Sequence, residues 1–287
     1  MSSDAAAIRV RPELRSRPAS RASRAGLDAG IMIGIAIAVI ALAAGIAITG
    51  VSARYFFQPT GVLIVLGGTI GVMLITTPAP ALLYAVQRAA RLFTVEVSPS
   101  REDLTEEIVW YAKLVRFEGL IAIEPVIPHV SHSFLQDALL LAMDAENRSE
   151  LESALENKIR LGERQSEAAA RVLEVAGGFA PTIGMLGTIV GLIDVLRQFA
   201  SLSAIASGVG AAFTSTIYGL ALANLVFLPV AYRIRARALG TLDLQELMME
   251  GVMCMFDRMH PRLVRQRLCY FVNEAPVSQP PLETPQV

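Results

Sequence analysis

Four long apolar runs constrain this chain more than any other feature of its sequence. They cover residues 27–51, 60–84, 175–199 and 204–232, and charged side chains are rare in all four. An α-helix needs about 20 mostly apolar residues to cross the hydrocarbon core of a bilayer, so each run is long enough to span it. The chain as a whole is 53% hydrophobic and only 18% charged, with a mean hydropathy of +0.50, which is unusual for a soluble domain. The predicted fold class is an all-α membrane protein with four transmembrane helices.

The distribution of arginine predicts the orientation of these spans, because cytoplasmic flanks carry an excess of Lys and Arg. Arginines precede the first span and follow the second and the fourth, at positions 9, 11, 15, 17, 21 and 24, then at Arg88 and Arg91, then at Arg233, Arg235 and Arg237. Both termini are therefore predicted to be cytoplasmic. The connections between spans 1 and 2 and between spans 3 and 4 are predicted to be short and to lie outside.

This topology divides the chain into five segments. Residues 1–26 form an Arg-rich cytoplasmic tail, and residues 27–84 hold spans 1 and 2. Residues 85–174 form a cytoplasmic domain, in which charge on one side of each segment and apolar residues on the other predict amphipathic helices. Residues 175–232 form the hairpin of spans 3 and 4, and residues 233–287 form a cytoplasmic tail with a Pro-rich end. The last helix of the cytoplasmic domain is predicted to run straight into span 3.

The remaining polar features do not point to catalysis. A secretory or transit peptide at the N-terminus is disfavoured, because the first apolar run is too long for a signal-peptide core and no clear small-residue cleavage site follows it. His129 and His132 have no Cys or Glu at ligand spacing and are interpreted as loop or surface histidines, and Cys254 and Cys269 as reduced cytoplasmic thiols. The sequence has no Gly-rich phosphate loop and no Ser-His-Asp or Cys-His arrangement. We expect no enzymatic activity, metal site, cofactor or nucleic-acid partner.

Spans 3 and 4 each carry a face of small and hydroxyl-bearing residues. At helical spacing, span 3 places Pro181, Gly184, Thr188 and Gly191 on one face, and span 4 places Gly208, Ala212, Thr216, Gly219 and Ala223 on one face. Close packing alone explains such faces, because small residues let helix backbones touch, and Gly187 with Gly191 fits that pattern by itself. The alternative is that both faces line one pathway. For any single residue the sequence leaves both interpretations open.

The spans can line an ion pathway only if a second chain takes part, because of the residues that they lack. Ion and proton pathways ordinarily keep an ionisable group inside the membrane. None of the four spans has an acidic residue, apart from Asp28 and Asp194 near their ends. If this chain takes part in conduction, another chain must supply the carboxylate, and a small, hydroxyl-lined face is a surface along which such an acidic helix could move.

Several segments resemble one known family. FAPTIGMLGTIVGLI and AAFTSTIYGLALANLVFLPVA resemble the third and fourth helices of the MotA/TolQ/ExbB proton channel family. PTGVLIVLGGTIG in span 2, RFEGLIAIE in the cytoplasmic domain and ELMMEGVMCMFDRMHPRLVRQRL in the tail resemble the flagellar stator branch, which is MotA- or PomA-like. The resemblance covers residues 27–272 in the expected order, which makes it far more specific than one short motif.

The resemblance implies a homo-pentamer in the bacterial inner membrane that encloses a MotB-like single-span partner. An aspartate of the partner would take up H⁺ or Na⁺, and ion flow would turn the ring against the rotor switch protein FliG. Carried over by position, Pro181 and Pro229 match the two membrane prolines of the family, and Thr188 and Thr216 match hydroxyls beside the ion path. Gly184, Gly187, Gly191, Gly219 and Ala223 fall on the channel face, and Arg116 and Glu124 match the charges that engage the rotor.

Two other functions compete with this interpretation. One keeps the ion-driven engine but couples it to another load, such as biopolymer transport or gliding, as in the ExbB/TolQ branch. The second-span motif and RFEGLIAIE favour the flagellar load over it. The other is a self-sufficient permease, which requires inverted repeats and polar sites at the membrane midplane, and neither is found in the sequence. The sequence does not distinguish H⁺ from Na⁺.

Overall fold

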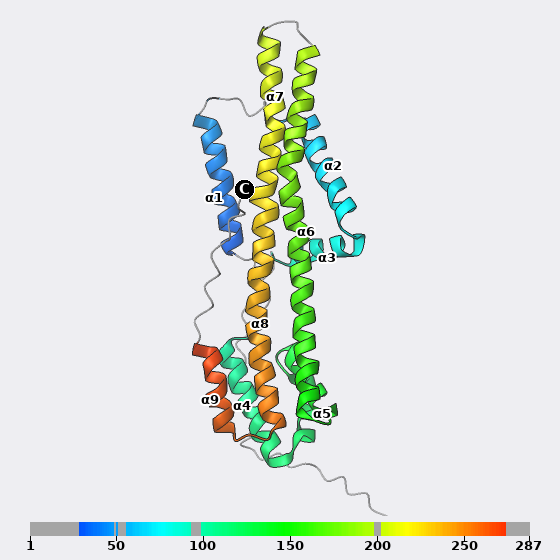
Figure 1. Cartoon of the computed structure of the whole chain (residues 1–287). Coiled ribbons are helices and arrows are strands. Elements are labelled where there is room, and N and C mark those ends of the chain that lie inside the picture. Colours follow the sequence, from blue (N-terminus) through cyan, green and yellow to red (C-terminus); the bar gives the residue numbers. More distant parts are fainter. Residues whose placement is uncertain (1–28, 49, 51–55, 93–98, 198–201, 274–287) are drawn as a thin grey trace, which may run out of the picture. The chain divides into compact units, whose positions relative to one another are not determined.

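The computed structural model describes residues 29–48, 50, 56–92, 99–197 and 202–273, and these residues are almost entirely helical (Figure 1). In chain order the elements are α1 (Ala29–Ile48), α2 (Pro59–Thr76), α3 (Ala79–Arg91), α4 (Arg101–Glu118), η3 (Leu120–His129), α5 (Ser133–Asp144), α6 (Arg148–Arg197), α7 (Leu202–Ala221), η4 (Leu222–Phe227), α8 (Leu228–Phe256) and α9 (Pro261–Asn273). No strand occurs in these ranges, which confirms the all-α class for them. The predicted N-terminal tail and the Pro-rich C-terminal end lie outside the described residues.

Three helical stretches of the described chain are long and apolar enough to cross a membrane. They are Pro59–Thr76, Arg148–Arg197 and Gly208–Phe256, and they overlap the second, third and fourth predicted spans. The first predicted span corresponds to α1, within which Ile33–Ile48 forms a shorter apolar helix. The count of four spans therefore stays a prediction. The predicted continuity into span 3 is confirmed, because α6 is a single helix of 50 residues.

The second predicted span is shorter than its apolar run. We expected one helix over residues 60–84, but α2 ends at Thr76 and the amphipathic helix α3 begins at Ala79. Thr77 has extended backbone angles, φ −133° and ψ 129°, and Pro78 precedes the first residue of α3. A residue before proline is pushed out of the helical region, and proline has no N–H to donate, so the helix must stop there.

The chain forms two compact units. The described residues of Ala25–Glu96 and Glu163–Ala238 form the span unit, and those of Val97–Gly162 and Leu239–Val287 form the globular unit. In the span unit, Met73 of α2 and Ala85 of α3 pack with Ala169, Val172 and Ala176 of α6. The second cluster of the span unit joins α3, α6 and α8 through Leu92, Ala170, Leu173, Ala231 and Ile234.

The globular unit has its own core, built from α4, η3, α5 and the ends of α6, α8 and α9. Its largest fully buried side chains are Tyr111, Leu104, Ile108, Ile123, Leu135, Leu139, Leu151, Leu155, Leu247, Met248, Met255 and Leu268. The N-cap of α4 is Ser100, whose hydroxyl accepts a hydrogen bond from the Asp103 N–H at 3.1 Å. Its C-cap is Gly119, whose φ of +86° is a left-handed value that favours glycine.

A buried carboxylate ties α4 to the segment that follows η3. Glu107, 5% exposed, accepts hydrogen bonds from the Tyr111 hydroxyl at 2.8 Å, from the Ser131 N–H at 3.1 Å and from the Ser131 hydroxyl. Because each carboxylate oxygen has a donor, the charge is tolerated in the core. Its neighbour His132 caps α5 by accepting from the Phe134 N–H at 3.1 Å. His129 is exposed and the half-buried His132 lies in the loop before α5, so both agree with the interpretation as loop or surface histidines.

The two thiols are both free, as predicted, with Cys254 buried and Cys269 exposed. Burial, with the nearby Glu250 carboxylate, raises the pKa of the Cys254 thiol to about 11, which keeps it protonated and unreactive. No group of residues suited to hold a metal ion occurs in the part of the chain that the structure describes.

His132 should make the stability of the globular unit depend on pH. Burial lowers the pKa of His132 below its usual 6.5, and the Glu107 carboxylate opposes this only in part. As pH falls, the unfolded chain therefore binds the proton first, so the free energy of unfolding should be intact above about pH 6.5 and decrease below it. His132→Asn keeps a capping acceptor that does not titrate. The free energy of unfolding of this variant should therefore decrease less as pH falls. Thermal unfolding of the full-length chain from about pH 5 to 8 measures both, and identical profiles would contradict the assignment.

Candidate functional site

The small residues of spans 3 and 4 meet at a seam between α6 and α7, which lie side by side (Figure 1). A Cβ atom on Gly219 would lie 2.5 Å from the Ala180 carbonyl oxygen, and one on Gly184 would lie 2.8 Å from the Ser215 carbonyl oxygen. A Cβ on Gly191 would lie 2.8 Å from that of Ala212. Side chains do not fit at such distances, so the two backbones touch because these residues are small.

Thr188 and Thr216 join their hydroxyl groups across this seam. Thr188 is buried, 9% exposed, and its Oγ1 lies 3.2 Å from the Gly184 carbonyl oxygen and 3.1 Å from the Ala212 carbonyl oxygen. It also makes a hydrogen bond with the Thr216 Oγ1. A hydroxyl has one proton and two lone pairs. If Thr188 donates to one carbonyl and accepts from Thr216, one lone pair of its oxygen is left for another donor or a cation.

The structure brings together two of the four predicted ion-pathway residues, Thr188 and Thr216, and most of the predicted channel-face glycines. Gly184, Gly187, Thr188, Gly191, Thr216 and Gly219 all lie at the contact of α6 with α7, and a Cβ on Gly187 would also lie 3.4 Å from Ile64 of α2. Ala223 is buried in η4, and Pro181 is half-buried in α6. Within one chain the small-residue face therefore packs helix against helix, as the first of the two interpretations required.

Pro229 lies away from this seam. It is exposed and borders a cavity of about 350 Å³ that also touches Gly34 of α1, Asn224 and Arg233. The preceding turn, η4, is a π-helix. Proline has no N–H, and its ring clashes with the carbonyl four residues earlier, here Leu225, so a wider turn before Pro229 relieves that conflict.

The two predicted rotor charges lie in the globular unit. Arg116, in the last turn of α4, is exposed and donates from Nη1 to the Arg258 carbonyl oxygen at 2.9 Å. Glu124 is exposed on η3. Both side chains are therefore accessible, and Arg116 also holds the turn between α8 and α9.

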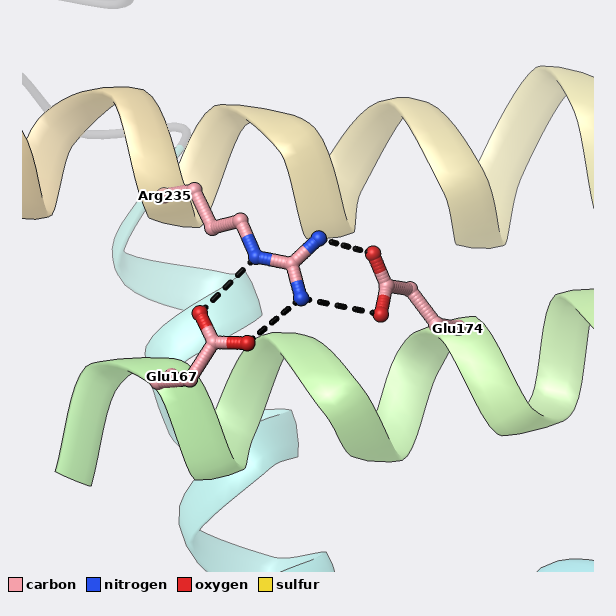
Figure 2. A network of polar contacts seen from close by, with 3 residues as sticks. All are labelled: Glu167, Glu174 and Arg235. Atoms are coloured by element: carbon pink, nitrogen blue, oxygen red, sulfur yellow. Dashed lines mark hydrogen bonds and ion pairs between the residues drawn. The ribbon is translucent and has the colours of Figure 1, made fainter. Parts of the chain in front are cut away.

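Sequence reasoning missed an ion-pair network in the span unit (Figure 2). Arg235 of α8 donates to Glu167 from Nε at 2.8 Å and from Nη2 at 2.6 Å. It also donates to Glu174 from Nη2 at 3.0 Å and from Nη1. We had taken Arg235 only as a marker of orientation. The available signal was the spacing of Glu167 and Glu174, which are seven residues apart and so lie on one face of α6.

The network shifts the ionisation of its members. Hydrogen bonding to Arg235 lowers the pKa of Glu167, and the same bond raises the pKa of Arg235. The guanidinium binds both carboxylates through paired N–H groups, a geometry that only arginine offers. The arrangement therefore joins α6 to α8 in its charged form at neutral pH.

A double-mutant cycle tests this network. Arg235→Gln, Glu167→Gln and the double variant should reveal a coupling of about 0.5–1 kcal/mol, because the groups are partly exposed and solvent screens them. The coupling should shrink as salt is raised. Thermal unfolding of the purified full-length chain in detergent, at low and high salt, gives the stabilities of the parent, the two single variants and the double variant. Strictly additive effects would show that the contact does not contribute to stability.

Two glycines of α6 test the seam as a matched pair. In Gly184→Ala the new Cβ would lie 2.8 Å from a backbone oxygen of α7, whereas in Gly178→Ala it meets nothing within 4 Å. We expect Gly184→Ala to cost about 1–3 kcal/mol by overpacking. Gly178→Ala should be neutral or slightly stabilising, since alanine favours helix. Abundance in the membrane and thermal stability in detergent are the measurements, and equal behaviour of the two variants would refute a tight seam.

Comparison with known proteins agrees with this arrangement of helices. Residues 127–246 match the family model described as the MotA/TolQ/ExbB proton channel family. Motility protein A of Bacillus subtilis is 28% identical over 250 residues, which cover 86% of this chain and 91% of that protein. Chemotaxis protein PomA of Vibrio alginolyticus is 29% identical over 245 residues, which cover 85% of this chain and 94% of that protein.

Solved structures give the same result. A chain of the flagellar MotAB stator complex from Bacillus subtilis superimposes with a TM-score of 0.78 at 28% identity, covering 84% of this chain and 94% of that one. A chain of C. jejuni MotAB gives a TM-score of 0.80, covers 88% of this chain and 100% of that one, and at 22% identity supports the fold alone. The described helices, including the hairpin of α6 and α7, thus have the fold found in chains of MotAB complexes. In sequence and fold the chain is similar to members of the MotA/TolQ/ExbB proton channel family.

Proposed function

We propose that this chain is the MotA-like subunit of a flagellar motor stator, which converts ion flow across the inner membrane into torque on the rotor. The observation that carries the proposal is the match to the MotAB stator complex, which extends over 84% of this chain at a TM-score of 0.78. The relatives named motility protein A and PomA match it over a similar share of the chain. The match includes the globular unit as well as the spans, so it concerns the part that meets the load and not the channel hairpin alone.

In this mechanism the ion binds to a second chain. The predicted spans have no acidic residue except Asp28 and Asp194 near their ends, and a relay of protons or cations across a bilayer needs a carboxylate or a comparable group. A single-span MotB-like partner would supply it as an aspartate. Five copies of this chain would surround two such helices, and each H⁺ or Na⁺ that crosses 100 mV would release about 2.3 kcal/mol per charge.

The seam of α6 and α7 supports a restricted role for Thr188 and Thr216. Their hydroxyls bond to each other, and the Thr188 hydroxyl also lies at hydrogen-bond distance from two helix carbonyls, so a cation or a protonated partner carboxyl meets a hydroxyl pair that is oriented in advance. The remaining lone pair of Thr188 would contact the passing group. Because that contact adds to bonds already present, it needs no rearrangement of the hairpin.

Arg116 and Glu124 would engage the rotor switch protein FliG. Both are exposed, and exposed ion pairs are worth about 0–1 kcal/mol each. Energies of this size are smaller than the energy released by one ion, so contacts with the rotor can break and reform at every step. An ExbB- or TolQ-like load remains the alternative, and it predicts a partner with a different periplasmic domain.

Complementation in the native host tests the load. In a strain that lacks this gene, the parent chain with its partner should restore swimming, and Arg116→Glu should restore membrane abundance but little swimming. A compensating charge reversal on FliG should recover part of the motility. A strain without the gene that swims normally but fails in biopolymer transport would assign the engine to the other load.

A further inference from the structure

A cavity of about 350 Å³ lies in the span unit, between α1 on one side and η4 with the start of α8 on the other. Among the residues that line it, only Asn224 and Arg233 are polar. Protein interiors are close-packed, and a void of this size leaves its walls without the van der Waals contacts that packing supplies. Its volume falls in the range of small-ligand pockets, about 300–1,000 Å³. The cavity therefore calls for an occupant.

Small residues beside this cavity leave space open, whereas those of the seam close it. A Cβ atom on Gly34 of α1, which lines the cavity, would meet nothing within 4 Å. A Cβ atom on Gly184 at the seam would lie 2.8 Å from a backbone oxygen of α7. On the other wall of the cavity, Pro229 is exposed. At the level of Gly34, α1 is therefore separated from α8 and does not pack against it.

The polar groups of the lining differ in what they leave for a ligand. Arg233 directly follows the fourth apolar run, at its predicted cytoplasmic end, and is exposed. Asn224 precedes it by about 14 Å along the chain axis, at the helical rise of 1.5 Å per residue. The Asn224 Nδ2 donates to the Leu220 carbonyl oxygen at 2.9 Å, so this donor is satisfied by its own helix. The cavity is thus apolar along its length, with a cation at the end nearest the predicted membrane surface.

Further arginines gather at the same end. Arg237 lies one helical turn after Arg233 and donates to the Arg91 and Leu92 carbonyl oxygens, at 3.0 and 2.8 Å. Leu92 itself lines the cavity. Three arginines, at positions 91, 233 and 237, are therefore grouped around the end of the cavity where the apolar run stops.

Acidic residues do not outweigh this group. The two carboxylates bound by Arg235 are offset by that residue and by Arg171, which lowers the pKa of Glu167. Asp28 and Glu96, the acids nearest in sequence to the lining residues, are fewer than the three arginines and lie outside the described residues. A guanidinium has five N–H donors and can serve two acceptors at once, as Arg235 does. Arg233 can therefore bind an anion in addition to a protein acceptor.

We propose that this cavity binds an anionic phospholipid, whose phosphate pairs with Arg233 and whose acyl chain runs between Gly34 and Pro229. Arginine binds phosphate through paired N–H groups, and basic pockets between transmembrane helices on the cytoplasmic side suit lipid headgroups. A helix of a second copy is too thick, because a segment about 14 Å long and 10 Å across fills roughly 1,000 Å³. The lipid joins α1 to α8 where no side chains do. This site is separate from the hydroxyl seam and from the proposed rotor charges.

Two matched pairs of variants test the headgroup contact and the acyl-chain contact separately. Arg233→Gln removes the phosphate ligand, and its control Arg171→Gln removes an exposed arginine of α6 that does not line the cavity. Gly34→Leu fills the cavity from α1. Its control Gly45→Leu places the same side chain on the same helix outside the cavity, and a Cβ atom meets nothing within 4 Å at either glycine.

The experiment uses the full-length chain assembled with its partner and purified in detergent. Dioleoylphosphatidylglycerol, dioleoylphosphatidylcholine and inorganic phosphate are the probes, and native mass spectrometry reports bound lipid and the mass of the assembly. The parent should bind the phosphatidylglycerol roughly tenfold or more tightly than the phosphatidylcholine, and phosphate alone should not displace it. Arg233→Gln and Gly34→Leu should each weaken binding of the phosphatidylglycerol roughly tenfold or more. Both controls should bind it like the parent, and the mass of the assembly should not change.

Each other result overturns the lipid site. Equal binding of the two lipids means that the anionic headgroup is not recognised, and displacement by inorganic phosphate identifies a site for a free anion. Parental binding in either Arg233→Gln or Gly34→Leu places the lipid elsewhere on the chain. A change in the mass of the assembly for Gly34→Leu but not for Gly45→Leu identifies a second copy as the occupant. None of these results bears on the proposed motor function, which is tested by motility.

Discussion

The direct backbone contact between α6 and α7 is the constraint on which the hairpin depends. Gly184 and Gly219 approach so closely that no side chain fits between them. Inside a bilayer the hydrophobic effect does not drive helices together, so close van der Waals contact and hydrogen bonds must do so. The hydroxyls of Thr188 and Thr216 add hydrogen bonds at the same place. The seam is thus a structural joint and a polar strip at once, and a substitution there affects both roles.

This double role changes how the threonines are to be understood. As isolated sequence positions, they are consistent with packing and also with an ion path. In the folded hairpin their protons are already used, and only oxygen lone pairs are left. A hydroxyl oxygen of this kind can accept a hydrogen bond from a protonated carboxyl or help to coordinate a cation. It does not replace the acid that the spans lack. In the proposed mechanism, the need for a second chain therefore follows from the composition of the spans and from the way their hydroxyls are bonded.

Outside the apolar runs, polar contacts join the helices to one another. Arg235 joins α8 to α6 through two carboxylates (Figure 2), and Glu107 anchors the segment between η3 and α5. Arg116 illustrates how structure and function share a residue, because it is exposed and yet fixes the turn at Arg258. Its reversal to glutamate would remove a surface charge and a tether together.

The sequence alone determined the helical class, the apolar segments of spans 2 to 4, the continuity of α6 and the small faces of the hairpin, because all of these follow from composition and local periodicity. It also placed Thr188 and Thr216 on the small faces of spans 3 and 4, and the structure joins the two hydroxyls by a hydrogen bond. It misjudged the end of the second span, where the local effect of Pro78 outweighed continued hydrophobicity. Tertiary structure alone decided that Pro229 lies away from the seam, that Arg235 binds Glu167 and Glu174, and that Arg258 lies against Arg116. Each of these depends on contacts between residues distant in sequence, which local patterns do not encode.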